Sequence, residues 1–158
     1  MSEWSEWRRL TIQEYTLLNQ PGPLWLSNID LAKAFLGEAN FAGANLWQAN
    51  LYRAYLERAN LTGAELVQAN LERAFLARAN LAGADLVGAN LTGANLADTN
   101  LEGADLGYVN LAGANLARAN LAGAKLLNAK LEGALYDKDT RWPEGFDPIK
   151  AGAIREGH

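Results

Sequence analysis

The chain of 158 residues carries a formal net charge of −4 and has an isoelectric point near 5.0, which argues against nonspecific nucleic-acid binding because that requires a basic surface. It contains no cysteine, so disulfides and thiolate metal sites are excluded. No apolar run approaches the roughly 20 residues of a membrane span and Met1–Trp4 does not begin a secretory signal, so we expect one soluble domain in the cytoplasm, with neither a membrane nor a nucleic acid as partner.

The first 28 residues differ from the rest of the chain and are predicted to form an N-terminal helical cap. Thr11 and Glu14 have the spacing of a capping box, which favours a short helix at residues 11–19. Leu24-Trp25-Leu26 has the form of a degenerate first copy of the repeat that follows. A stack of repeats needs such a cap, because its first turn would otherwise expose leucines and unpaired backbone groups.

A strict five-residue repeat fills the middle of the chain. Leucine occupies every fifth position from Leu31 to Leu131, 21 positions in all, with Phe41 as the one substitution. The residue two before this centre is alanine in 18 of 21 repeats, and the residue directly before it is Asn or Asp in 15 of 21. A period of five fits neither a helix nor a flat strand, so one small unit is stacked along an axis.

A slower period of 20 residues sets the size of one turn. Glycine recurs at that spacing, two residues after the centre, at Gly43, Gly63, Gly83, Gly103 and Gly123. Twenty residues are four repeats, so we predict four-sided turns, a little over five in number, around a column filled by leucine and alanine. Glycine suits a corner with positive φ. Arginine fills equivalent positions, however, which predicts that positive φ is not required at every corner; these arginines are Arg53, Arg58, Arg73 and Arg78.

The run Ala79-Asn80-Leu81-Ala82-Gly83-Ala84-Asp85-Leu86 shows the repeat clearly. This A(N/D)Lxx pattern closely resembles that of the pentapeptide-repeat family. The resemblance implies an all-β fold, a right-handed quadrilateral β-helix, here over residues 29–135. The segment 136–158 is similar to the ending of cyanobacterial members, and we expect this C-terminal tail to place Trp142 and Phe146 over the last coil.

The residues available for chemistry argue against an enzyme. The only histidine is His158, the last residue, and all serines precede the repeats, at Ser2, Ser5 and Ser27. No Ser/His, Cys/His or His-carboxylate combination can be assembled from them, and no glycine-rich phosphate loop leads into a helix. We therefore predict a non-enzymatic protein without a cofactor or a metal, whose function depends on its outer walls.

One wall of the predicted stack carries an aromatic ladder with arginines beside it. Phe35, Tyr55 and Phe75 directly precede their centres at a spacing of 20, and Arg58 and Arg78 line the neighbouring corner. Aromatic and arginine side chains together are typical of protein-binding patches. Two alternatives are that the rings stabilise adjacent strands, or that they lie beneath the N-terminal cap.

The opposite wall carries an apolar stripe beside an acidic one. Trp47, Val67 and Val87 follow their centres and continue to Leu127, with an interruption at Gly107. Trp47 could anchor a protein partner or a second copy of the chain, or contact a cap. The acidic stripe consists of Glu65, Asp85 and Asp105. It could attract a cation, although a solvated acidic edge is the more usual role of such a stripe.

The leading functional hypothesis is a non-catalytic scaffold that presents its walls to an unidentified protein partner, with weak self-association left open. The alternative is a DNA mimic that inhibits a topoisomerase such as gyrase, which requires a strongly acidic rod. Residues 30–138 hold 11 acidic and 9 basic residues, a net charge of only −2. Ice binding would require regular threonine ladders, whereas Thr62 and Thr92 stand on different walls.

Overall fold

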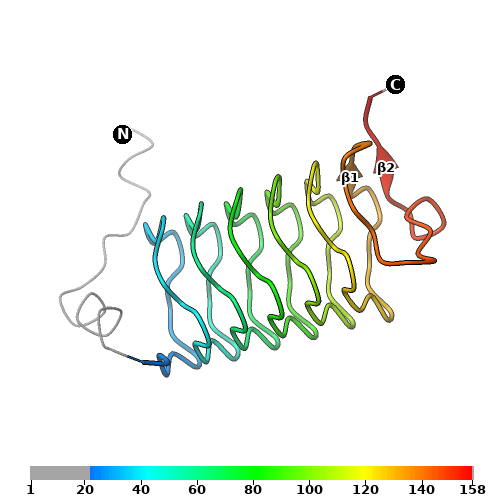
Figure 1. Cartoon of the computed structure of the whole chain (residues 1–158). Coiled ribbons are helices and arrows are strands. Elements are labelled where there is room, and N and C mark those ends of the chain that lie inside the picture. The colour runs from blue at the N-terminus through cyan, green and yellow to red at the C-terminus, as the bar shows by residue number, and fades with distance from the viewer. Residues whose placement is uncertain (1–21, 158) are drawn as a thin grey trace, which may run out of the picture.

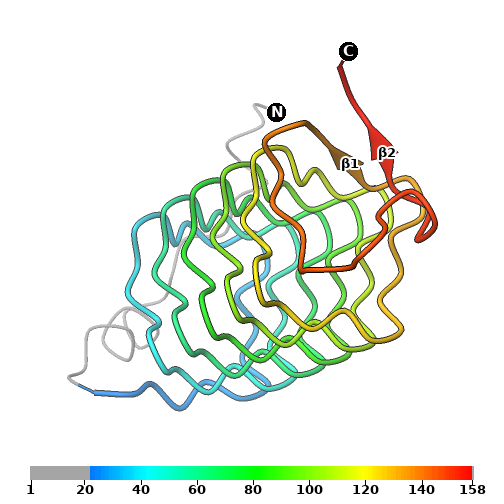
Figure 2. The ribbon, with the colours of Figure 1, turned by 45° about the vertical axis from the view of Figure 1, so that its right-hand side comes forward.

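The chain winds into a solenoid of stacked turns in the computed structural model, which describes residues 22–157 (Figure 1). Parallel bridges join residues that are 20 apart in the sequence, beginning at Trp25 with Asn45 and continuing through Asn115 with Leu135. Each turn therefore contains four repeats, as the spacing of the glycines predicts. Figure 2 shows the turns lying one behind another around a common interior.

The backbone of each repeat is hydrogen-bonded both to itself and to the adjacent turns. Leu46 N donates to Glu65 O at 2.8 Å, and Glu65 N donates to Ala44 O at 2.9 Å, so the two turns exchange bonds in both directions. Within the repeat, Ala49 N donates to Leu46 O at 3.0 Å and closes a tight turn. A backbone N–H or C=O group that is buried without a hydrogen-bond partner destabilises the fold. This regular pairing therefore allows such short extended segments to stack.

The interior is a column of leucine and alanine. Leu51, Leu66 and Leu86 have no solvent-exposed surface, and Phe41, which stands in the place of a leucine, is almost completely buried as well. Burial of each leucine contributes about 1.5–3 kcal/mol, which is an upper estimate because the unfolded chain already buries some apolar surface. Thr99 replaces an alanine of the column, and its buried hydroxyl donates to Leu76 O at 2.8 Å.

The backbone φ angles at the corners contradict the prediction about arginine. The second residue after each leucine has a positive φ whatever its side chain, including Arg53 at 52°, Arg58 at 58°, Arg73 at 56° and Arg78 at 62°. The prediction that arginine would relieve the corner of a positive φ is therefore wrong. The tight turn between each leucine carbonyl and the next alanine N–H places this residue third, where a type II turn requires a positive φ. The stacked turns impose that geometry on every amino acid.

The solenoid extends beyond the regular repeats at both ends. At the start, Leu24 and Leu26 are buried, which confirms the degenerate first repeat. At the other end, strand β1 (Leu135–Tyr136) pairs in parallel with strand β2 (Ile154–Arg155). Tyr136 is buried in a leucine position, and Arg141 bridges with Asn120. The winding therefore continues into the predicted tail.

Aromatic side chains close the C-terminal end of the core. The rings of Tyr136 and Trp142 meet edge to face at a centroid distance of 5.4 Å, and Trp142 stacks on Phe146 at 5.3 Å. Trp142 and Phe146 both pack against the buried core, as expected for a cap. The division into segments 1–28, 29–135 and 136–158 stays a prediction.

The helix predicted at residues 11–19 lies outside the described residues. Residues 22–157 contain no helix, and thus none long and apolar enough to cross a membrane. The right-handed sense of the winding and the number of about five coils stay predictions.

Candidate functional site

The surface of the solenoid consists of walls formed by equivalent repeats of successive turns. Each wall presents three columns of side chains, which are the residue before the leucine and the two residues after it. The wall built on Leu46, Leu66 and Leu86 is called here the tryptophan wall, and the wall built on Leu56, Leu76 and Leu96 the aromatic wall. These two walls are separated by two repeats and lie on opposite sides of each turn.

The tryptophan wall collects the exposed apolar side chains of the molecule. Seven large apolar residues are exposed within residues 22–157, and four of them belong to this wall or its corner. Trp25 is 81% exposed and Trp47 42%, while Tyr108 and Leu127 are also exposed. Val67 and Val87 lie between them and are half-buried. Trp47, Val67 and Val87 thus share one column, as the 20-residue period predicts.

Gly107 interrupts this apolar column. Gly107 is buried, and a Cβ atom placed on it would lie 3.8 Å from Val87 Cγ2, 3.9 Å from Leu127 O and 3.3 Å from Asp105 Oδ1. Unlike the corner glycines, Gly107 does not have a positive φ, so the backbone does not require glycine here. Asp105, Val87 and Leu127 therefore enclose this position, and the apolar column has no side chain of its own at this turn.

The acidic column runs beside the apolar one. Glu65, Asp85 and Asp105 follow one another on successive turns. Asp85 Oδ1 accepts a hydrogen bond from Val87 N, and Asp105 Oδ1 accepts one from Gly107 N, both at 3.1 Å. Lys125 Nζ lies 3.6 Å from Asp105 Oδ2. No group of three or more such side chains within residues 22–157 is arranged to hold a metal ion.

The aromatic ladder packs against itself. The ring centroids of Phe35 and Tyr55 are 6.1 Å apart, and those of Tyr55 and Phe75 are 5.9 Å apart. The Tyr55 hydroxyl donates to Glu57 Oε2 at 2.8 Å, and this hydrogen bond, together with the negative charge of Glu57, raises the pKa of Tyr55. Phe35 is exposed, whereas Tyr55 and Phe75 are half-buried. The contacts between rings give the ladder a role in holding successive turns together.

The arginines beside this ladder differ in their partners. Arg58 Nη1 lies 3.7 Å from Glu38 Oε1 in an exposed ion pair. Within the part of the chain that the structure describes, Arg78 forms no ion pair. The two guanidinium groups line a shallow hollow together with Asp98 and Arg118. The predicted grouping of Arg58 and Arg78 in one column is therefore observed, with acidic residues on both sides of it.

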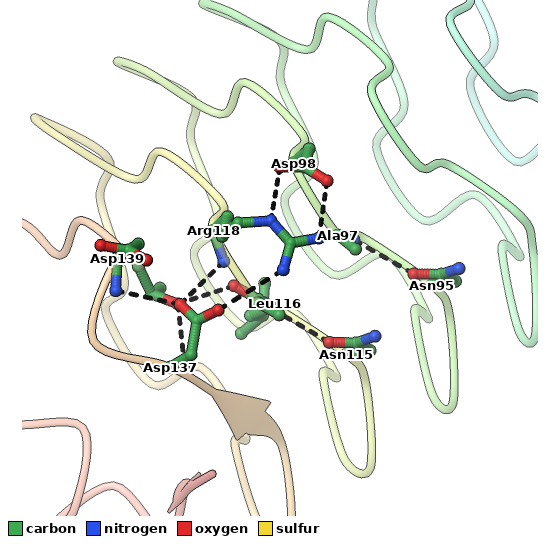
Figure 3. A network of polar contacts seen from close by, with 10 residues as sticks. Asn95, Ala97, Asp98, Asn115, Leu116, Arg118, Asp137 and Asp139 are labelled. Carbon is green, nitrogen blue, oxygen red and sulfur yellow. Dashed lines mark hydrogen bonds and ion pairs between the residues drawn. The ribbon is translucent and has the colours of Figure 1, made fainter. Parts of the chain in front are cut away.

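An ionic network on the same wall fastens the tail to the stack (Figure 3). Arg118 donates two hydrogen bonds of 2.8 Å to the Asp98 carboxylate, and its Nη1 lies 3.7 Å from Asp137 Oδ2. Asp137 Oδ1 accepts hydrogen bonds of 3.0 Å from the backbone N–H groups of Arg118 and Asp139. Thr140 Oγ1 reaches Leu116 O at 2.9 Å. Three segments of the chain therefore meet at one point.

The network changes the pKa of both of its anchoring carboxyl groups. The hydrogen bonds from Arg118 lower the pKa of Asp98. Burial by itself raises the pKa of Asp137, but hydrogen bonds from backbone N–H groups and from the Thr140 hydroxyl outweigh it and lower that pKa overall. The sequence contained a signal for part of this network, because Asp98 and Arg118 have opposite charges and are 20 residues apart.

Two exposed aromatic residues of the tryptophan wall were missed by the sequence analysis of the site. Trp25 precedes the regular repeats, yet it bridges with Asn45 and stands at the head of the acidic column. Tyr108 occupies a corner position where glycine or a polar residue is usual. The 20-residue period assigns both residues to this wall once Leu24-Trp25-Leu26 is counted as a repeat.

The five-residue repeat of this chain matches that of known proteins. The family model of pentapeptide repeats matches in eight copies, over residues 26–58, 39–78, 76–107 and 99–135. The crystal structure of alr5209, a pentapeptide repeat protein from Nostoc PCC 7120, is 42% identical, and the match covers 66% of this chain and 86% of that one with a TM-score of 0.65.

Two further cyanobacterial structures are similar. Rfr23 from Cyanothece 51142 is 40% identical over 66% of this chain and 64% of its own, with a TM-score of 0.50. HetL from Nostoc sp. strain PCC 7120, a pentapeptide repeat protein involved in heterocyst differentiation regulation, is 32% identical over 81% of this chain and 70% of its own, with a TM-score of 0.46. No curated protein matches. The matching repeats cover residues 26–135, and the chain belongs to the pentapeptide-repeat family.

Proposed function

We propose that this chain is a non-enzymatic scaffold that binds a protein partner through its tryptophan wall. The observation that carries the proposal is the concentration of four of the seven exposed large apolar residues of the described chain on one side of the solenoid, namely Trp25, Trp47, Tyr108 and Leu127. Exposed aromatic side chains at the centre of a patch are typical of protein interfaces and supply most of their binding energy. We expect the protein to meet this partner in the cytoplasm.

The solenoid holds this wall in a fixed shape. Each turn is hydrogen-bonded to the turns beside it, so the side-chain columns keep their spacing without a ligand. We infer that the winding is right-handed and quadrilateral, with about five coils, as the family resemblance implies. A preformed surface loses little conformational entropy on binding, which favours affinity.

The aromatic wall is the weaker candidate for a binding surface. Phe35, Tyr55 and Phe75 contact one another through their rings, and the Tyr55 hydroxyl is engaged by Glu57. Arg58 and Arg78 lie among acidic side chains. We infer that this ladder mainly stabilises neighbouring turns.

The distribution of charged side chains over the walls argues against the alternative function of a gyrase-inhibiting DNA mimic. The acidic column of the tryptophan wall contains three carboxylates, while the aromatic wall carries Arg58, Arg78 and Arg118. A DNA mimic requires rows of negative charge along the rod, because proteins that bind DNA recognise its closely spaced phosphates with basic residues. A supercoiling assay with purified gyrase should accordingly show no inhibition at micromolar protein.

The proposal is tested by affinity capture from the organism that encodes the protein. The test variant is Trp47→Thr/Val67→Thr/Val87→Thr, which should fold because Thr62 and Thr92 occupy the same position of the repeat. The matched control changes that column on other walls, as Thr62→Ala/Ala82→Thr/Thr92→Ala.

We expect a protein that the parent and the control retain and the test variant loses. Titration of that purified protein should then show affinity at least about tenfold lower for the test variant. Equal capture by all three baits would show that the tryptophan wall is not the binding surface.

A further inference from the structure

We infer that the tryptophan wall binds an amphipathic α-helix that carries lysine or arginine along one flank of its apolar stripe. This inference rests on the proposed function and names the chemistry of the partner. It follows from two parallel columns of different character, one apolar and one acidic, that run along the axis of the solenoid. A partner must present two matching rows, side by side and in the same direction.

The backbone of the wall leaves no edge for an extended peptide to join. Leu66 N donates to Asp85 O at 2.7 Å, and Gln68 N donates to Val87 O at 2.9 Å. These bonds between turns recur along the wall and occupy the N–H and C=O groups that strand addition would need. Recognition on this surface therefore depends on side chains, which favours an element whose own backbone is satisfied internally. An α-helix meets that condition.

The dimensions of a helix fit the column. Successive turns of a β-solenoid are about 4.8 Å apart, and one turn of an α-helix rises 5.4 Å. Four such steps separate Trp47 from Leu127, a length of about 19 Å that roughly 13 helical residues span. An apolar stripe of period 3.6 can thus place a side chain near each turn.

The charges require a cationic flank on one side of that stripe. Glu65, Asp85 and Asp105 border the apolar column on one side, and Lys125, which lies 3.6 Å from Asp105, ends this row beside Leu127. The column on the other side contains no charged residue and consists of Gln48, Gln68, Gly88, Tyr108 and Asn128. Lysine or arginine beside the apolar stripe of the helix would therefore meet carboxylates, whereas an acidic helix would be repelled.

The same charges disfavour a second copy of this chain as the occupant. Two copies facing each other in antiparallel fashion would place Asp85 near its own counterpart and Glu65 near Asp105. Two parallel copies with facing apolar columns would place these carboxylates opposite the uncharged column of Gln68 and Tyr108, where they would lose solvent without gaining a cation. Like-charge contacts and desolvated unpaired carboxylates are both unfavourable, so an isologous dimer through this wall is not expected.

The experiment uses a synthetic helical peptide of about 15 residues with a leucine stripe and lysines along one flank, the Leu/Lys peptide. A second peptide carries glutamate in place of lysine. Binding to the full-length protein is measured by fluorescence anisotropy, and peptide helicity by circular dichroism. We expect the Leu/Lys peptide to bind at least about tenfold more tightly than the Leu/Glu peptide, to gain helicity, and to weaken as salt rises.

The acidic column is tested by Glu65→Asn/Asp85→Asn/Asp105→Asn. Asparagine preserves the local hydrogen bond, because Asn45 Oδ1 accepts from Trp47 N at 3.0 Å in the same column. The control Glu72→Gln/Glu102→Gln/Glu132→Gln removes the same number of charges from other walls. We expect about tenfold weaker binding for the first variant only. Equal weakening by both variants would show nonspecific attraction and overturn the inference.

The apolar column supplies an independent test. Val67→Thr/Val87→Thr makes this column more polar without changing a charge, and we expect it to weaken the binding of the Leu/Lys peptide by several-fold. Parent-like affinity in both this variant and the acidic-column variant would overturn the assignment of the helix to this wall. Failure of the parent to bind the Leu/Lys peptide would also refute the inference that the wall binds a helix. Capture of a protein partner that requires Trp47, Val67 and Val87 would in that case still support the proposed scaffold function.

Discussion

The corner residue of each repeat is held at positive φ even where its side chain makes this conformation costly. Glycine adopts it freely, whereas a left-handed conformation costs other residues about 1–2 kcal/mol. Thirteen non-glycine residues of the described chain accept that cost, among them Arg73 and Tyr108. The hydrogen bonds of the turns above and below leave no alternative conformation. Local strain is thus offset by stacking rather than avoided.

Substitution of a corner glycine isolates this conformational cost. Gly83 has a φ of +65°, and a Cβ atom placed there would meet nothing within 4 Å. Gly83→Val should therefore lower the free energy of unfolding by about 1–2 kcal/mol through the backbone alone. Urea denaturation measures the change. Gly83→Asn is the control and should cost less, because asparagine tolerates this region and Asn28 and Asn128 occupy the same position. An equal loss in both variants would refute the explanation.

At the scale of structural elements, ladders of like residues connect the turns. Asparagines before the leucines accept a hydrogen bond within their own repeat and donate to the turn before, as Asn60 Nδ2 does to Asn40 Oδ1 at 3.3 Å. The same hydrogen bond to the preceding turn recurs at Asn100 and Asn120. The aromatic ladder of Phe35, Tyr55 and Phe75 occupies the equivalent column and connects turns through ring contacts instead.

Replacement of the aromatic ladder separates its stability role from partner binding. Phe35→Asn/Tyr55→Asn/Phe75→Asn should remain folded, because Asn95 and Asn115 continue the same column. The lost ring contacts should lower the free energy of unfolding by about 1–3 kcal/mol in total. Thermal melting followed by circular dichroism measures this loss. Binding at the tryptophan wall should be unchanged, and a partner lost with this variant would instead make the aromatic wall the interface.

The ionic network at the C-terminal turn predicts a dependence of stability on pH. The folded-state pKa values of Asp98 and Asp137 are lowered from the usual range, whereas an unfolded aspartate titrates near pH 3.9. The unfolded state therefore binds protons first as pH falls, so the stabilisation is complete above about pH 4 and is lost as pH falls through the folded-state values.

This dependence is measured as the free energy of unfolding in urea at neutral and acidic pH. Asp98→Asn/Asp137→Asn should be less stable than the parent at pH 7 and should lose less stability on acidification. Parallel pH profiles for parent and variant would contradict the assignment. The Asp98 side chain is 34% exposed and its partner Arg118 is 51% exposed, so solvent screening is expected to keep the contribution of this pair modest.

The whole molecule behaves as a one-dimensional stack in which each turn contacts its neighbours. Because bridges join residues 20 apart, removal of residues 82–101 should connect two turns in register. Such a protein should fold cooperatively with a lower Tm, since one inter-turn interface is lost. Deletion of residues 82–99 is the control, because it breaks the five-residue phase and turns leucines outward. Circular dichroism and melting distinguish them, and equal behaviour would refute the nearest-neighbour description.

The sequence by itself determined the five-residue phase, the 20-residue turn and the columns that contain Trp47, Val67 and Val87, because these depend only on spacing along the chain. The tertiary structure decided the positive φ at Arg53 and Arg78, since stacking of other turns imposes it. It also decided the exposure of Trp25, the burial of Gly107 and the contacts of Asp137. Those features depend on distances between atoms of different turns and on a tail whose spacing departs from the repeat.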